Sequence, residues 1–485
     1  MMTSRFCCNS PRKTVWSNSR LLSFSLFVLG MAGCAGKPWG AARSEKDLEA
    51  VAAFAPGAWT ALGVKREAAA EGWLLDFGNE TLRALVNEAL AANPDLKAAA
   101  ARVEQARQDV RVATADLLPT LDGSGNGSRA QRPGDQRFPG LGQRANRFNL
   151  SLDVAWEPDF WGRIRDERRA AVASFEAGTA DYHAARLSLA ANTVKAAFAA
   201  AEAEAQVALA TENVETRRLQ QGLLEKQLDR GLEAEKVALD VSLGRADLAR
   251  AESELTGQKR ALDAARRSLE GLLGRYPAGR VAELKALPVP RRNVPAGLPA
   301  ELLSRRPDVL AAELRLFESL NLESAARKAL LPGIRLTGDK GYSSQELADL
   351  VSVQAAVWTI ASGVTQPLFQ GGRLRAGAKR ARARYDELLN VYAGTAQTAF
   401  REVETALAAE RFLVEQQEEL ARAKVEAERA EQLALGQYGR GLVDVLTVLD
   451  SRQRAYDANR ALVTARALRL RNRADLYLAL GGAFE

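Results

Sequence analysis

The sequence predicts a mainly helical fold with a small β part, built from one structural unit that occurs twice along the chain. Three observations support this: repeated proline spacing, long proline-free stretches with helical periodicity, and short stretches in which polar and apolar residues alternate. Pro307 lies 213 residues after Pro94, and Pro332 lies the same distance after Pro119. A tandem duplication of this kind favours a fold with internal pseudo-symmetry over a single catalytic pocket.

Residues 1–33 have the features of an export signal that is removed from the mature protein. Four basic residues precede an apolar run over 21–30, and small residues stand directly before Cys34. The apolar run is shorter than the roughly 20 residues that a transmembrane helix needs. Because small residues before a cysteine resemble a bacterial lipoprotein cleavage site, we expect a lipid on Cys34. The alternative is an ordinary signal peptide followed by a chance cysteine.

Removal of this segment changes the composition of the chain. Four basic and no acidic residues leave with it, so the formal net charge falls from +7 to +3. The hypothesis of nucleic-acid binding, which depends mainly on a high positive charge, is thereby weakened. Cys7 and Cys8 leave as well, so Cys34 is the remaining cysteine and a disulfide framework is excluded. A single lipid anchor gives modest membrane affinity, so we expect a second means of membrane attachment.

The first unit is expected over 80–274, after a wrapped N-terminal segment over 34–79. It begins with a helix over about 80–117, which Pro94 breaks or restarts. A β-hairpin follows at about 119–161, because alternation with a period of two is typical of a strand with two different faces. The alternating residues are Phe148, Leu150, Leu152, Val154 and Trp156. We expect an exposed loop over about 130–146 between the strands of the hairpin, because prolines, glycines and arginines are frequent there.

Two helices complete this unit. The proline-free stretch over 162–229 predicts one long helix, which would be about 100 Å long at 1.5 Å per residue. A glycine at position 231 ends it, and a return helix is expected over 233–273.

The second unit is expected over 301–485 and repeats the same order, after a proline-rich linker over 275–300. Its hairpin is predicted at about 333–369, its long helix at 371–438 and its return helix at 445–480. Apolar or small residues in the long helix recur at alternating spacings of three and four, which is the pattern of a coiled-coil seam.

One compact chain cannot bury the apolar seams of the long helices or pair the edges of the strands. Four strands cannot close a membrane β-barrel, since known barrels have at least eight, and lipid does not tolerate open strand edges. If the strands enter a membrane, three chains would contribute twelve strands to one barrel. The alternative is a soluble periplasmic coiled-coil protein with two small hairpins.

Several short motifs, taken in their order and spacing, resemble those of the TolC-type outer-membrane factors. The resemblance is to the lipoprotein branch that serves resistance-nodulation-division efflux pumps, and it covers nearly the whole mature chain. The motifs lie at 93–96, 117–119, 297–308, 367–374, 438–442 and 448–450. The resemblance implies a homotrimer in which a twelve-stranded membrane β-barrel is continued by a periplasmic α-helical barrel.

The same resemblance implies the function. The chain would be the outer-membrane channel of a tripartite efflux pump, a passive exit duct for drugs or other small molecules in a Gram-negative bacterium. Its partners would be a periplasmic adaptor (membrane fusion protein) and an inner-membrane pump of the resistance-nodulation-division class. Two alternatives stay open: the duct of a type I protein secretion system, and a lipid-anchored periplasmic coiled-coil protein without a pore.

The resemblance also places a gate at the tip where each long helix turns into its return helix. The candidate residues are Leu446, Asp450, Asp444, Tyr438, Arg452, Arg454 and Asp240. Leu446 would lie in the constriction, Asp450 would face it, and Tyr438 with Arg452 or Arg454 would join the bonds that keep it closed. Three copies of an aspartate around a threefold axis favour cations and make opening sensitive to pH and salt. For Asp444 and Asp450 the alternative is an ordinary solvated position near a turn.

No catalytic, cofactor-binding or metal-binding residues are expected, apart from the lipid on Cys34. The chain has a single histidine, His183, inside a predicted long helix, where a packed or surface position is the simpler interpretation. The glycines at 123, 125 and 127 lack the spacing of a dinucleotide-binding loop, and no phosphate-binding loop motif occurs. The sequence therefore does not predict an enzyme.

Overall fold

The helices and strands of the computed structural model follow the order of two consecutive units. The structure describes residues 41–53, 55, 72–132, 143–229, 234–281, 284, 286–290 and 299–482. Preceding the units are α1 (Ala41–Ala52) and the short helix η1 (Trp73–Phe77). The first unit contains α2 (Glu80–Ala92), α3 (Pro94–Ala115), β1 (Thr120–Arg132), β2 (Gln143–Trp156), α4 (Arg163–Asp229) and α5 (Ala234–Leu272). The second contains α6 (Pro299–Arg305), α7 (Pro307–Lys328), β3 (Gly333–Ser344), η2 (Leu347–Asp349), η3 (Val353–Ala355), β4 (Ala356–Thr365), α8 (Arg373–Tyr438) and α9 (Val445–Ala479). Cys34 and the turn residues 230–233 lie outside the described residues.

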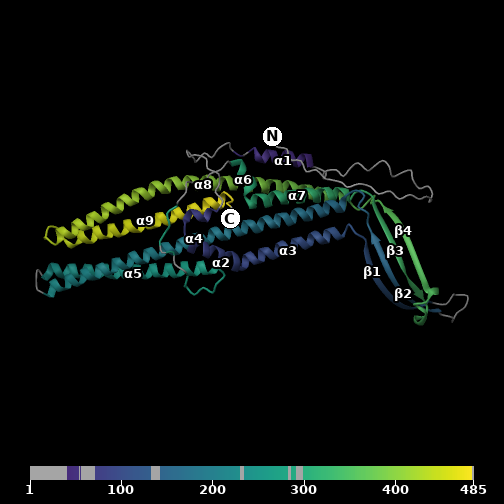
Figure 1. Cartoon of the computed structure of the whole chain (residues 1–485), viewed down its shortest axis with the longest axis horizontal. Helices are drawn as coiled ribbons and strands as arrows, with labels where there is room; N and C mark the ends of the chain where they lie inside the picture. Colours follow the sequence, from purple (N-terminus) through teal and green to yellow (C-terminus); the bar gives the residue numbers. More distant parts are fainter. Residues whose placement is uncertain are drawn as a thin grey trace. The chain divides into compact units, whose positions relative to one another are not determined.

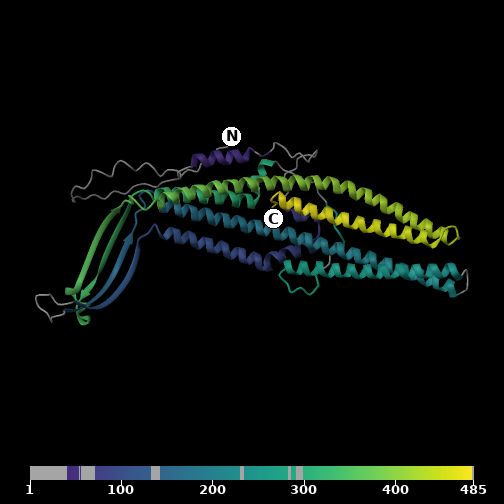
Figure 2. The same ribbon diagram turned by 180° about the vertical axis from the view of Figure 1, so that it is seen from behind.

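The two long helices are uninterrupted, with 67 residues in α4 and 66 in α8. At 1.5 Å per residue each is about 100 Å long. The return helices α5 and α9 lie beside them, and α4 and α8 end away from the strands (Figures 1 and 2). Among the described helices, none is both long and apolar enough to cross a membrane.

The helix expected over 80–117 is in fact two helices, because Asn93 ends α2 and caps α3. Its Oδ1 accepts hydrogen bonds from the backbone N–H groups of Asp95 (2.9 Å) and Leu96 (3.1 Å). Pro94 takes the first position of α3, where a missing N–H leaves no helical hydrogen bond unmade. Asn93 Nδ2 also donates to the carbonyl oxygen of Leu272 (3.0 Å), at the end of α5. Pro94 therefore marks a restart of the helix.

The strands form one antiparallel sheet in the order β1-β2-β3-β4, so the hairpins of the two units pair side by side. The loop expected over 130–146 is shorter, because Arg132 still pairs with Gln143; polar side chains on an exposed strand do not prevent backbone pairing. β4 ends at Thr365, earlier than expected, because Pro367 cannot donate a ladder hydrogen bond.

A buried cluster joins η1 to helices of both units. Trp73 stacks on Tyr477 of α9, with ring centroids 5.5 Å apart, and Phe77 meets Phe198 of α4 edge to face at 5.1 Å. Within it, Asp76 Oδ2 accepts hydrogen bonds from Arg473 Nε (3.1 Å) and from the Tyr477 hydroxyl (2.9 Å). Desolvation raises the pKa of Tyr477, so its hydroxyl remains a donor.

Helix α1 covers one face of α7 and α8. The hydroxyl of Tyr385 in α8 donates to Asp47 Oδ2 of α1 (2.8 Å). Leu48 packs against a cluster that contains Leu316 and Leu320 of α7. The described parts of the expected N-terminal segment thus pack on the helices as α1 and η1.

Candidate functional site

The tip at the far end of the helices is held by a small apolar cluster that spans both units. Its buried members are Leu224 of α4, Val237 and Val241 of α5, and Val445 and Leu449 of α9. Leu228 and Tyr438 pack against it. The cluster therefore ties the helix pair of the first unit to the return helix of the second.

Arg452 adds a polar connection between three helices at this tip. Its Nε donates to Glu431 Oε1 of α8 (2.9 Å), and its other guanidinium nitrogen Nη1 donates to Gln220 Oε1 of α4 (2.7 Å). The side chains of Arg452 and Glu431 are 12% and 25% exposed. Charge-assisted hydrogen bonds shielded in this way are stronger than those in open solvent. Of the two predicted arginines, Arg452 is the one that the structure places between helices.

Arg454 has a different environment. It pairs with Asp450 one turn earlier on the same helix (2.9 Å), and both side chains are largely exposed. Such a pair contributes little to stability. Leu446 lies one further turn back and is 52% exposed. Since these three residues are four apart, they form one exposed stripe of α9, facing away from the buried Val445 and Leu449.

Asp444 has a structural role at the start of α9. Its Oδ1 accepts hydrogen bonds from the backbone N–H (2.8 Å) and the hydroxyl (2.6 Å) of Thr447. It is therefore the N-cap of this helix, a position at which replacement by alanine costs about 0.5–2 kcal/mol.

Tyr438 and Asp240 face each other across the tip from α8 and α5. Desolvation, followed by the negative charge of Asp240, raises the pKa of the Tyr438 hydroxyl. The hydroxyl thus stays protonated at neutral pH and can donate a hydrogen bond. The facing residues of the first turn, 230–233, lie outside the described residues.

At the other end of the helices, the sheet has two chemically different faces. On one face glycines of β1 stand opposite large apolar residues of β2, as in the pairs Gly125↔Leu150 and Gly127↔Phe148. A Cβ at Gly127 would come within 3.3 Å of the Phe148 ring, so the small residue makes room for the large one. On β4 the same face presents Ile360, which is 81% exposed. An apolar face of this kind suits lipid.

The opposite face is polar and carries three aspartates in a row. Asp122 pairs with Asp153, and Asp153 pairs with Asp339, so β1, β2 and β3 each place one carboxylate at the same level. Like charges placed directly opposite one another destabilise a sheet. Ser124 Oγ donates to Asp153 Oδ2 (2.9 Å) and offsets part of this cost. In the part of the chain that the structure describes, no group of His, Cys, Asp or Glu could hold a metal ion.

Comparison with known proteins decides the family. The family model "Outer membrane efflux protein" matches residues 85–275 and 298–482. The outer membrane protein OprJ of Pseudomonas aeruginosa is 31% identical over 474 residues, which cover 96% of each chain. The cation efflux system protein CusC of Escherichia coli is 30% identical over 423 residues, covering 85% of this chain and 88% of CusC. The solved structure of the outer-membrane channel OprN matches with a TM-score of 0.82 at 28% identity, over 89% of this chain and 97% of OprN.

This chain belongs to the outer membrane efflux protein family. The predictions of the family, of the fold class, of an efflux function and of an outer-membrane location are confirmed by these matches. The relatives are efflux and channel proteins, not enzymes. They give no support to a type I secretion duct or to a coiled-coil protein without a pore.

In this outer membrane efflux protein the structure separates the predicted tip residues into two groups. Tyr438 and Arg452 contact other helices of the same chain, whereas Leu446 and Asp450 lie on the exposed stripe of α9. The aspartate row was not predicted from the sequence. The sequence shows the alternation in β2, but the aspartate row also depends on how β2 pairs with β3, a strand of the other unit.

Proposed function

We propose that three copies of this outer membrane efflux protein form a passive exit duct for small molecules across the outer membrane. The observation that carries the proposal is the sheet, which has an apolar face and two edge strands, β1 and β4, with no further partner among the described strands. Edges of this kind must be paired inside lipid. Three sheets of four strands would pair every edge and give a closed barrel with the polar face inside.

We propose that the duct receives its cargo from an inner-membrane pump of the resistance-nodulation-division class through a periplasmic adaptor. The printed name of CusC describes a cation efflux system, and other relatives are described as antibiotic or toluene efflux pump proteins. The cargo therefore differs between relatives of similar identity. This variation supports a duct whose cargo is chosen by its partners.

The tip is the proposed gate of this duct. The exposed stripe of Leu446 and Asp450 is free to line the pore or to meet a neighbouring copy, because it faces away from its own chain's cluster. Tyr438, Asp240 and Arg452 would hold α8, α5 and α4 against α9 in the closed state. Asp444 would set the position at which α9 starts.

Bilayer recording and mass measurement together test the duct. The purified chain in amphipol should have three times the mass of one protomer by light scattering. After reconstitution it should conduct weakly, and conduct more once the tip is opened by Arg452→Ala. A protein of single-protomer mass, or a trimer that stays silent with the tip opened, contradicts the proposal.

We also propose that Cys34 carries a lipid, on the basis of the small residues before it. Metabolic labelling with an alkyne analogue of palmitate should mark the wild-type chain and leave Cys34→Ser unlabelled. Equal labelling of the two would contradict a lipid at this position.

A further inference from the structure

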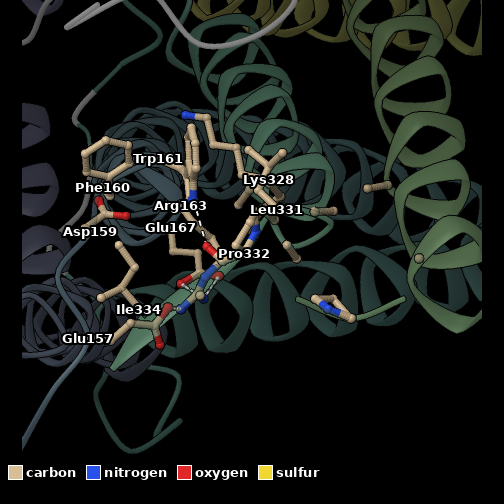
Figure 3. Close-up of a pocket in the computed structure, with 18 of the residues that line it drawn as sticks. Glu157, Asp159, Phe160, Trp161, Arg163, Glu167, Lys328, Leu331, Pro332 and Ile334 are labelled. Atoms are coloured by element: carbon tan, nitrogen blue, oxygen red, sulfur yellow. Dashed lines mark hydrogen bonds and ion pairs between the residues drawn. The ribbon is translucent and has the colours of Figure 1, made fainter. Parts of the chain in front are cut away.

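A cavity of about 720 Å³ lies where the sheet meets the helices, far from the tip. Figure 3 shows Phe160, Trp161, Leu331, Pro332 and Ile334 around it. Trp161 Nε1 donates to the carbonyl oxygen of Pro332 (2.7 Å). This bond joins the β2–α4 connection to the end of α7 and fixes the indole at the cavity wall.

The walls of the cavity are largely apolar. The Phe160 and Trp161 rings meet edge to face, with centroids 4.8 Å apart. Helix α7 contributes Ala325 and Ala326, whose short side chains leave the space between α4 and α8 open. Pockets that bind small molecules combine apolar walls of this kind with a few placed polar groups.

Gly377 of α8 helps to keep the cavity open. A glycine inside a helix is about 1 kcal/mol less favourable than an alanine. A Cβ at Gly377 would meet no atom within 4 Å, so the packing around it gives no reason for a glycine. A side chain at this position would project into space that the cavity now has.

The acidic groups at the cavity are already paired. Arg163 forms ion pairs with Glu157 (2.8 Å) and Glu167 (2.9 Å). Asp159 accepts hydrogen bonds from the backbone N–H groups of Ile164 (3.1 Å) and Arg165 (2.9 Å) at the start of α4. These carboxylates are therefore occupied by groups of the same chain.

Two further cations of the lining are occupied as well. Lys328 pairs with Asp166 (2.5 Å), and Arg384 pairs with Glu387. Arg380 differs, because it makes no hydrogen bond or ion pair with any described residue. The cavity thus presents one uncompensated positive charge beside apolar walls.

The cavity is on a different face of α7 from the one that packs on α8. Leu316 and Leu320 form a cluster with Tyr385 and Leu388 of α8, whereas Leu322 and Ala326 line the cavity. At 3.6 residues per turn these two pairs lie on different sides of the helix.

We propose that this cavity binds small amphiphiles that combine an apolar body, such as an aromatic ring system, with one anionic group. The anion would pair with Arg380, and the apolar body would lie between Trp161 and the alanines of α7. The number of sites per duct rests on the proposed trimer, whereas binding to the cavity depends only on the fold of one chain. Each trimer would hold three such molecules where the helices meet the sheet.

Equilibrium dialysis with three related probes tests the proposal on the full chain in amphipol. The probes are 1-naphthoate, the neutral 1-naphthylmethanol and the cationic 1-naphthylmethylamine. We expect naphthoate to bind about tenfold more tightly than the alcohol, as one hydrogen bond to a charged group implies. The amine should bind more weakly than both. Equal binding of naphthoate and the alcohol would overturn the assignment of the anion to Arg380.

Three variants locate the site. Arg380→Gln should weaken naphthoate binding about tenfold, while Gly377→Leu should abolish it by filling the cavity and leave the thermal stability unchanged or higher. Arg375→Gln is the matched control, because Arg375 of α8 also makes no hydrogen bond or ion pair with a described residue and does not line the cavity. The proposal is overturned if Gly377→Leu binds like the wild type, or if Arg380→Gln and Arg375→Gln behave alike.

The source of the natural anion is distinguished by lipid composition. Dialysis is repeated in nanodiscs of phosphatidylcholine and of phosphatidylglycerol. Weaker naphthoate binding in phosphatidylglycerol identifies a lipid phosphate as the competing ligand, and equal binding identifies a soluble molecule in the duct. Conductance of the same samples reports on the duct separately, so loss of probe binding with normal conductance rejects the cavity proposal alone.

Discussion

The two ends of this molecule carry their charged groups on different kinds of support. At the sheet end, Asp122, Asp153 and Asp339 are fixed by the backbone ladder of three strands. At the tip, Arg452 holds Glu431 and Gln220 through side-chain hydrogen bonds between separate helices.

This difference separates two tasks within one duct. A row fixed by backbone pairing cannot move without unpairing strands, so it can act on ions only through its constant charge. A link made by side chains can open while every helix stays intact. Within the proposed duct, we therefore expect charge selection at the sheet end and opening at the tip.

The largest effect is expected between the two ends, at the buried pair of Asp76 and Arg473. Asp76→Ala removes the nearer carboxylate of the buried Arg473 and leaves its longer ion pair with Glu410 (3.8 Å); breaking a buried pair costs about 3–5 kcal/mol. We expect a lower unfolding temperature of the trimer in a thermal scan, with unchanged ion selectivity in whatever fraction remains folded. A changed selectivity would mean that the sheet end depends on the middle of the molecule.

Removal of the Arg452 guanidinium should have the next largest effect. Arg452→Ala breaks two hydrogen bonds to a charged group, each of which contributes about 1.5–3 kcal/mol. We expect higher single-channel conductance in planar bilayers, because α9 loses its links to α8 and α4. The matched control is Arg454→Ala, which removes an exposed pair and should change conductance little. Equal effects of the two variants would place the closing bonds elsewhere.

A smaller effect is expected at the start of α9. Asp444→Ala removes the N-cap and should destabilise the first turn of the helix by about 1 kcal/mol. Hydrogen exchange should then become faster at Thr447 and its neighbours. Asp444→Ser keeps a capping oxygen and should restore slow exchange. If serine fails to restore it, the carboxylate has a role besides capping.

The smallest effect is expected at the aspartate row. Changing Asp122, Asp153 and Asp339 together to asparagine should lower the preference for cations by less than about 1 kcal/mol per ion, a factor of roughly five or less, because the row acts through water. The reversal potential in a KCl gradient measures this directly. Ser343→Ala on the same face serves as the uncharged control. A reversal potential that stays at its wild-type value would exclude these carboxylates from the selectivity of the duct.

The regular elements of this fold could be predicted from local features of the sequence. The helix expected over 371–438 is Arg373–Tyr438, because no proline interrupts it and glycines stand at both ends. The extent of the first hairpin was less predictable. Polar residues up to Arg132 pair across the sheet, and composition alone assigned them to a loop.

The environments of the site residues could not be predicted from the sequence, because they depend on tertiary packing. Arg452 and Arg454 are two residues apart, so they point to different sides of α9, and only the packing of α4 and α8 decides which one is shielded. The aspartate row needs the register between β2 and β3, which come from different units. The cavity near Trp161 is lined by residues of α4, α7, β3 and α8, so no local sequence pattern predicts it.

The contact between Asp76 and Arg473 also constrains how the chain comes to be folded. The two residues are 397 positions apart, and η1 packs against the return helix of the second unit. Contacts so distant in sequence form slowly, because a long loop must close first. The face of η1 that meets α9 therefore stays uncovered until α9 is present, although Phe77 can pack on Phe198 of α4 earlier. During that interval the Trp73 ring lacks the Tyr477 ring on which it stacks.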